Sequence, residues 1–130
     1  MITQNTVEKK LRIAIIQADI FWENPESNLK KYDLLIPEKR KFDLIVLPEM
    51  FSTGFSVSTR DGAEESNGIS FQWLQQKAKS LNTAMIGSIP TIIDGKLFNR
   101  LYFIFPDGTF EYYDKHHLFS YSGEHLTFSA

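Results

Sequence analysis

A short aliphatic run that ends in a proline and a carboxylate leaves this chain few possible folds. Residues 44–47 read Leu-Ile-Val-Leu, and Pro48 and Glu49 follow them. An unbroken aliphatic run is typical of a strand buried on both faces of a parallel α/β sheet, and proline ends its ladder because it has no N–H to donate. Ligands bind such sheets at the carboxyl ends of the strands. Glu49 is therefore a candidate site residue, and a local cap or ion pair is an equally good explanation.

The residues around this run predict a strand, helix, strand unit. Residues 11–19 are mostly aliphatic and predict a first strand, which we expect to be central in the sheet. A helix is expected to begin at Asn24, whose side chain can cap it, with Pro25 at the first helical position, and to end before Pro37. With a strand at 43–47 this makes a βαβ unit.

The second part of the chain predicts one more helix and a meander of long strands. Apolar residues recur at helical spacing over 69–81. Strands are expected at 84–93, 97–105 and 109–113, the first two joined by a hairpin turn at Asp94-Gly95. Residues 101–105 are apolar on both faces, so we expect helices to cover one side of this sheet and a second sheet to cover the other.

Composition and charge narrow the class of protein further. With 130 residues, of which 42% are hydrophobic, the chain has enough apolar surface for one domain. A net charge of −2 gives no electrostatic reason to expect nucleic acid or an anionic membrane as partner. No apolar run approaches the roughly 20 residues that span a bilayer, and residues 1–10 are too polar for a signal peptide, so we expect a cytoplasmic protein. The chain contains no cysteine, and therefore no disulfide and no thiol nucleophile.

A third segment, residues 113–119, reads Tyr-Asp-Lys-His-His-Leu-Phe. Together with Ile-Ala-Ile-Ile-Gln-Ala-Asp at 13–19 and Leu-Pro-Glu-Met-Phe at 47–51, it resembles the amino-terminal half of the nitrilase superfamily of carbon–nitrogen hydrolases. The motifs are most similar to the ω-amidase branch, which hydrolyses the terminal amide of short 2-oxo dicarboxylic acid monoamides. The resemblance implies an α/β fold, an α-β-β-α sandwich that assembles as dimers. Residues 11–130 would be its amino-terminal half, after a disordered terminus at 1–10.

The resemblance also implies roles for single residues. The superfamily uses a Glu, Lys and Cys triad, in which Glu49 would be the general base and Lys115 would stabilise the oxyanion. Glu124 matches a second glutamate that orients the site, and a solvated loop carboxylate is the alternative. The nucleophilic cysteine has no counterpart in these residues. We therefore expect the chain to be incomplete and inactive alone.

Three further residues are candidates for substrate binding: Phe55, His116 and Tyr121. The two aromatic residues would fit a plain apolar core equally well. A metal site at His116 and His117 is not expected, because adjacent residues of an extended chain point away from each other and no nearby residues complete a ligand set. No cofactor is expected.

The leading hypothesis is a cofactor-independent amidase that releases ammonia from a small amide such as 2-oxoglutaramate. The missing nucleophile favours another class, a truncated and catalytically silent binding or assembly module with the same half fold. A nucleotide-binding domain would need a phosphate-binding glycine loop, and the sequence has none. We also expect either self-association or a missing companion segment at an unpaired apolar strand edge such as 101–105.

Overall fold

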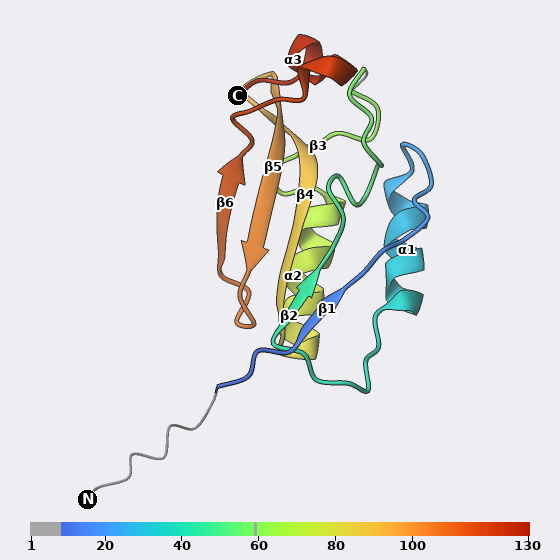
Figure 1. The fold of residues 1–130 in the computed structure, drawn as a ribbon, viewed down its shortest axis with the longest axis vertical. Helices are drawn as coiled ribbons and strands as arrows, with labels where there is room; N and C mark the ends of the chain where they lie inside the picture. The colour runs from blue at the N-terminus through green and yellow to red at the C-terminus, as the bar shows by residue number, and fades with distance from the viewer. Residues whose placement is uncertain (1–8, 59) are drawn as a thin grey trace, which may run out of the picture.

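A mixed sheet with helices packed on one face forms the body of the computed structural model, which describes residues 9–58 and 60–130 (Figure 1). The sheet has six strands in the order β1-β2-β4-β5-β6, and β3 pairs with β4. The strands are β1 (Ile13–Ile15), β2 (Leu44–Val46), β3 (Glu64–Glu65), β4 (Ala84–Ile93), β5 (Lys96–Ile104) and β6 (Phe110–Asp114). The helices are α1 (Pro25–Leu35), α2 (Ile69–Leu81), the short α3 (Glu124–Thr127) and a 3-10 turn at Ser120–Ser122.

The predicted strand, helix, strand unit is present. β1 and β2 are parallel, and β2 is in turn parallel to β4. The Asn24 side chain caps α1 by accepting a hydrogen bond from the Ser27 N–H at 3.1 Å, with Pro25 at the start of the helix. The predicted bounds of α2 are confirmed at both ends, and Asn82 follows it in the left-handed conformation common after helices.

The predicted meander is also confirmed. β4 covers the expected residues 84–93 and pairs antiparallel with β5, which pairs antiparallel with β6. Asp94 and Gly95 join β4 to β5 with φ angles of 49° and 74°. Two successive positive φ values are typical of a tight hairpin, and Asp-Gly accepts them at low cost.

Two predictions about strand placement are wrong. β1 spans only Ile13–Ile15, and within the described residues it pairs with β2 alone, so it lies at the edge of the sheet. An aliphatic run favours a strand but carries no information on that strand's neighbours. Residues 101–105 were expected at an unpaired edge, yet β5 lies between β4 and β6. Self-association through this segment's edge is therefore not possible in this sheet.

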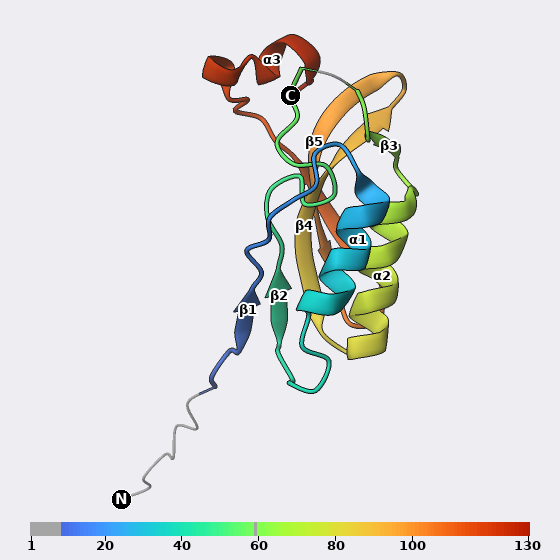
Figure 2. The ribbon, with the colours of Figure 1, turned by 90° about the vertical axis from the view of Figure 1, so that its right-hand side faces the viewer.

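The core lies between the sheet and the pair α1 and α2, which Figure 2 shows on the same side of the sheet. Tyr32, Phe51, Leu74 and Met85 are fully buried there. The Tyr32 hydroxyl donates to the Phe51 carbonyl at 3.0 Å, so α1 holds the segment that follows β2. The start of that segment carries Glu49.

The opposite face of the sheet is more open. Ile13 and Ile15 point to this face, and 47% and 78% of their surfaces are exposed. A second sheet over this face remains a prediction. Residues 9 and 10 have no regular secondary structure, and the rest of the predicted disordered terminus, residues 1–8, lies outside the described residues. No helix in the described part of the chain is long and apolar enough to cross a membrane.

Candidate active site

Glu49 stands in a tight turn that follows β2. The next residue, Met50, has a φ of 48°, a left-handed conformation that is uncommon for a residue with a side chain. Ser88 of β4 stabilises this turn, because its hydroxyl accepts from the Met50 N–H at 2.8 Å and its carbonyl accepts from the Phe51 N–H at 3.3 Å. The turn directs Glu49 toward Lys115, with about half of its side chain (49%) exposed.

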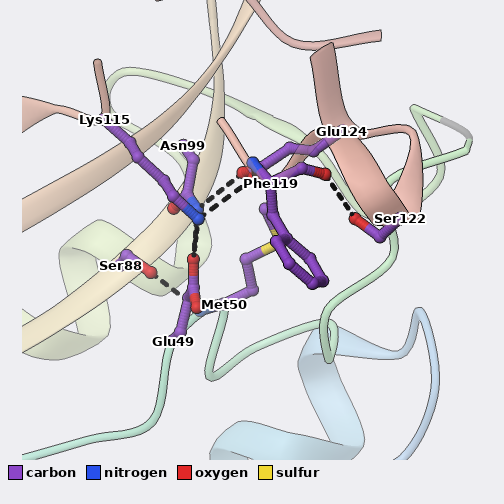
Figure 3. Close-up of polar contacts among 8 residues, drawn as sticks. All are labelled: Glu49, Met50, Ser88, Asn99, Lys115, Phe119, Ser122 and Glu124. Carbon is purple, nitrogen blue, oxygen red and sulfur yellow. Dashed lines mark hydrogen bonds and ion pairs between the residues drawn. The ribbon is translucent and has the colours of Figure 1, made fainter. Parts of the chain in front are cut away.

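Lys115 comes one residue after β6. Its N–H donates to the Asn99 carbonyl at 3.0 Å, which extends the β5–β6 ladder by one step. Its amino group donates to Glu49 Oε1 at 2.9 Å and to Glu124 Oε2 at 3.0 Å, so it lies between two carboxylates (Figure 3). Partial burial disfavours the charged amine, but these hydrogen bonds and charges outweigh it and raise the pKa of Lys115. Lys115 is therefore an ammonium ion at neutral pH.

A second ion pair fixes the register of β5 against β6, the strand that Lys115 follows. On the helix side of the sheet, Arg100 binds Asp114 with two hydrogen bonds of 2.7 and 2.8 Å. Arg100 also stacks on the Tyr112 ring, 3.9 Å from its centroid. Successive residues of a strand point to opposite faces. Holding Arg100 against Asp114 therefore holds the preceding Asn99 and the following Lys115 together on the other face.

Glu124 is fully buried, which excludes the alternative of a solvated loop carboxylate. Its Oε2 accepts from Lys115 and from the Phe119 N–H at 2.6 Å, and its Oε1 accepts from the Asn99 amide at 3.2 Å. The short helix α3 begins at Glu124 and places it there. A buried carboxylate needs such partners, because an unpaired charge in a protein interior is costly.

Asn99 is the residue of this cluster that sequence reasoning missed. It is buried in β5, and its side-chain nitrogen donates to Glu49 Oε1 at 2.8 Å as well as to Glu124. The available signal was a polar pair, Asn99-Arg100, inside the otherwise apolar run 97–105. Polar side chains buried in a strand require hydrogen-bond partners, so this pair pointed to a polar site or a buried ion pair. The structure contains both.

A cavity of about 300 Å³ opens beside these charges. Leu47, Leu101 and Tyr113 form an apolar wall, and Glu49 and Lys115 lie at its polar end. A small organic molecule fits a hollow of this size. The carboxylate can exchange a proton with such a molecule, and the ammonium group can stabilise a negative charge that develops on it.

The three predicted substrate-binding residues are not among the residues that line this cavity. The Phe55 ring centroid lies 5.3 Å from the Lys115 amino nitrogen. His116 is exposed and packs on Tyr113, which lines the cavity, with ring centroids 5.1 Å apart. Tyr121 is 95% exposed and contacts only the Phe119 ring among the ring contacts of the described residues. Their roles in binding remain predictions.

The part of the chain that the structure describes holds no group of three or more His, Cys, Asp or Glu side chains that could bind a metal ion. The charged cluster contains Glu49 and Glu124, and Lys115 occupies the space between them.

Comparison with known proteins identifies the family. Residues 12–129 match the carbon-nitrogen hydrolase family. The chain is 33% identical to the ω-amidase YafV of Yersinia enterocolitica, over 92% of this chain and 46% of that protein. It is also 33% identical to the 2-oxoglutaramate amidase of Bacillus subtilis, over 93% of this chain and 48% of that protein.

A solved structure agrees with these relatives. XC1258 from Xanthomonas campestris, a CN-hydrolase superfamily protein with an arsenic adduct in the active site, matches with a TM-score of 0.87 and 39% identity. The match covers 92% of this chain and 46% of that one. The chain spans about half the length of the curated relatives it matches.

These matches show that the chain belongs to the carbon-nitrogen hydrolase family. The resemblance to the nitrilase superfamily and its ω-amidase-like branch is thereby confirmed, and so is the predicted fold, since one sheet and its helix layer match about half of such a protein.

Proposed function

We propose that the complete protein hydrolyses the terminal amide of a small 2-oxo dicarboxylic acid monoamide, such as 2-oxoglutaramate, and releases ammonia. The observation that carries this proposal is the Lys115 amino group held between Glu49 and Glu124 beside an apolar cavity. Family membership supports hydrolysis of a carbon–nitrogen bond. The similarity to an ω-amidase and a 2-oxoglutaramate amidase supports the substrate class.

In this proposal Glu49 is the general base. It takes the proton of the attacking thiol, passes that proton to the departing amine, and then activates the water that releases the acyl group. No described residue donates a hydrogen bond to Glu49 Oε2, so this oxygen is available for the proton. Lys115 supplies a fixed ammonium group for the oxyanion, and losing one comparable donor costs about 10²–10³ in rate.

Glu124 has an orienting role in the proposal. It is buried against the far side of the Lys115 amino group and pairs with it at 3.0 Å, which fixes where the ammonium charge lies. Phe55 would pack against the acyl chain beside Lys115, while His116 and Tyr121 would complete the substrate site. No cofactor takes part. A homodimer or higher oligomer is proposed for the complete protein on the resemblance alone, and a cytoplasmic location on the polar start of the sequence.

The nucleophile must come from outside these residues, because the 130 residues include no cysteine. The chain by itself is therefore proposed to be inactive. Reading the coding sequence past the codon for Ala130 tests this point. A reading frame that continues and encodes a cysteine at a strand-to-helix turn supports the amidase.

The absence of a cysteine also favours the second candidate function, a catalytically silent binding or assembly module. An immediate stop codon after Ala130 would support this module and would contradict the amidase proposal. The charged cluster would then serve as a buried structural ion pair.

The role of Glu49 is tested by the substitution Glu49→Gln in the complete protein. We expect no ammonia release from 2-oxoglutaramate, with an unchanged thermal unfolding curve, because the amide keeps the shape of the side chain but cannot take a proton. Glu26→Gln is the matched control, since it removes the same charge from an exposed position in α1. Full activity of Glu49→Gln would refute the assignment.

A further inference from the structure

A single asparagine contacts every charged residue of the candidate active site. Asn99 donates one hydrogen bond to Glu49 and one to Glu124, and its carbonyl accepts from the backbone N–H of Lys115. Asn99 is 3% exposed. Its main chain is fixed in the middle of the sheet, because β5 is paired on both sides.

The two hydrogens of the Asn99 amide are used by two carboxylates. An amide nitrogen carries two N–H bonds, and here one serves Glu49 Oε1 at 2.8 Å and the other serves Glu124 Oε1 at 3.2 Å. Because both hydrogens are used in this way, the amide group has no N–H left for a substrate. Its effect on a reaction must therefore pass through the carboxylates.

The arrangement also determines which oxygen of Glu49 can act. Asn99 and Lys115 both donate to Oε1, at 2.8 and 2.9 Å. Two donors on one oxygen fix the plane of the carboxylate. The other oxygen, Oε2, has no donor among the described residues and is the one available to the reacting groups.

Electrostatics gives the amide a second effect. Glu49 and Glu124 share one ammonium group, so two negative charges lie on either side of a single positive charge. The Asn99 amide binds both carboxylates without adding a charge that would compete with Lys115 for the oxyanion.

We propose that Asn99 is a positioning residue that holds Glu49 by its Oε1 and so leaves its Oε2 for the reacting groups. This inference rests on the proposed function, in which Glu49 is the general base. Asn99 does not contact the reacting atoms; it acts through the orientation of Glu49.

The test is Asn99→Leu in the complete protein, assayed for ammonia release from 2-oxoglutaramate over a range of substrate concentrations. Leucine has a similar size and no N–H donors. We expect kcat to fall about 10- to 100-fold, the range that corresponds to one charge-assisted hydrogen bond, while KM changes less than about threefold because the Asn99 amide does not bind the substrate.

Asn28→Leu is the matched control. Asn28 is also a fully buried asparagine, but its amide binds only the backbone of Phe21 and Ser52. Its loss should lower thermal stability and leave kcat unchanged. Should Asn99→Leu fail to fold, Asn99→Ser gives the same readouts, because serine is smaller than the space that asparagine fills and is too short to reach both carboxylates.

The outcomes separate this inference from the proposed function. An unchanged kcat in the Asn99 variants, or a fall in kcat that Asn28→Leu reproduces, overturns the role of Asn99. If Glu49→Gln is inactive in that case, the proposed function still stands. If Glu49→Gln keeps full turnover, the proposed function itself fails, whatever the Asn99 variants do.

Discussion

The ion pair between Lys115 and Glu124 should be strongly coupled in stability, and a double-mutant cycle can measure the coupling. The two substitutions are Lys115→Met and Glu124→Gln, which remove one charge each and keep most of the side-chain volume. Removing Lys115 leaves the buried carboxylate of Glu124 with only the N–H groups of Phe119 and Asn99. Its charge is then largely uncompensated.

The structure gives the magnitude. Breaking a buried ion pair by removing one partner costs about 3–5 kcal/mol. The Lys115 side chain is 28% exposed, so water can replace part of its interaction, and we expect a cost near the lower end, about 3 kcal/mol. Glu124→Gln should cost about 1–2 kcal/mol, because Lys115 keeps its bond to Glu49 and only the charge-assisted bonds to Glu124 weaken.

The double variant contains no buried unpaired charge at Glu124, so it should cost about 2 kcal/mol less than the sum of the two single variants. The assay is urea unfolding monitored by far-UV circular dichroism. Free energies of unfolding are compared between variants whose free energy falls with urea concentration at the same slope. Additivity within about 0.5 kcal/mol would refute the reasoning, since it would mean that the two charges do not depend on each other in the folded state.

Two further variants test the packing and the ionisation of the core beneath the site. Gly87→Ala should cost about 1–3 kcal/mol, because the added methyl would lie 2.9 Å from a ring carbon of Phe51. Combining it with Phe51→Leu should recover part of that loss. If the losses of unfolding free energy caused by the two substitutions simply add in urea unfolding, the contact between residues 87 and 51 is contradicted. Burial raises the pKa of Tyr32 from 10.0 to about 12, so its neutral form stabilises the protein fully below pH 10 and less and less as the pH rises toward 12. Tyr32→Phe should therefore lose less stability than the natural protein between pH 10 and 12, and parallel curves would argue against the shift.

Local sequence patterns predicted the elements well. The helix α2 and the strand β4 have the predicted bounds, because helical spacing, a left-handed Asn82 and an Asp-Gly turn are all properties of neighbouring residues. The edge position of β1 was missed, since the order of strands depends on how connections cross the sheet. No short window of sequence contains that information.

In the candidate active site, too, local sequence predicted some residues, while others depend on how distant strands pair. Glu49 and Lys115 could be found because each stands in a recognisable motif directly after a strand. Asn99 could not be assigned in this way, because its meaning depends on the register of β5 against β6 and on the turn that brings Glu49 to it. Its partners lie 50 residues before it and 25 residues after it.

The long separations within the charged cluster have a consequence during synthesis of the protein. Glu49 and Lys115 are 66 residues apart, which at about 5–20 residues per second means roughly 3 to 13 s between their appearance on the ribosome. Until β4 has been made, the strand β2 before Glu49 has only β1 to pair with. The cluster is completed only when α3 supplies Glu124, so its formation marks the moment when all strands of this sheet are in place.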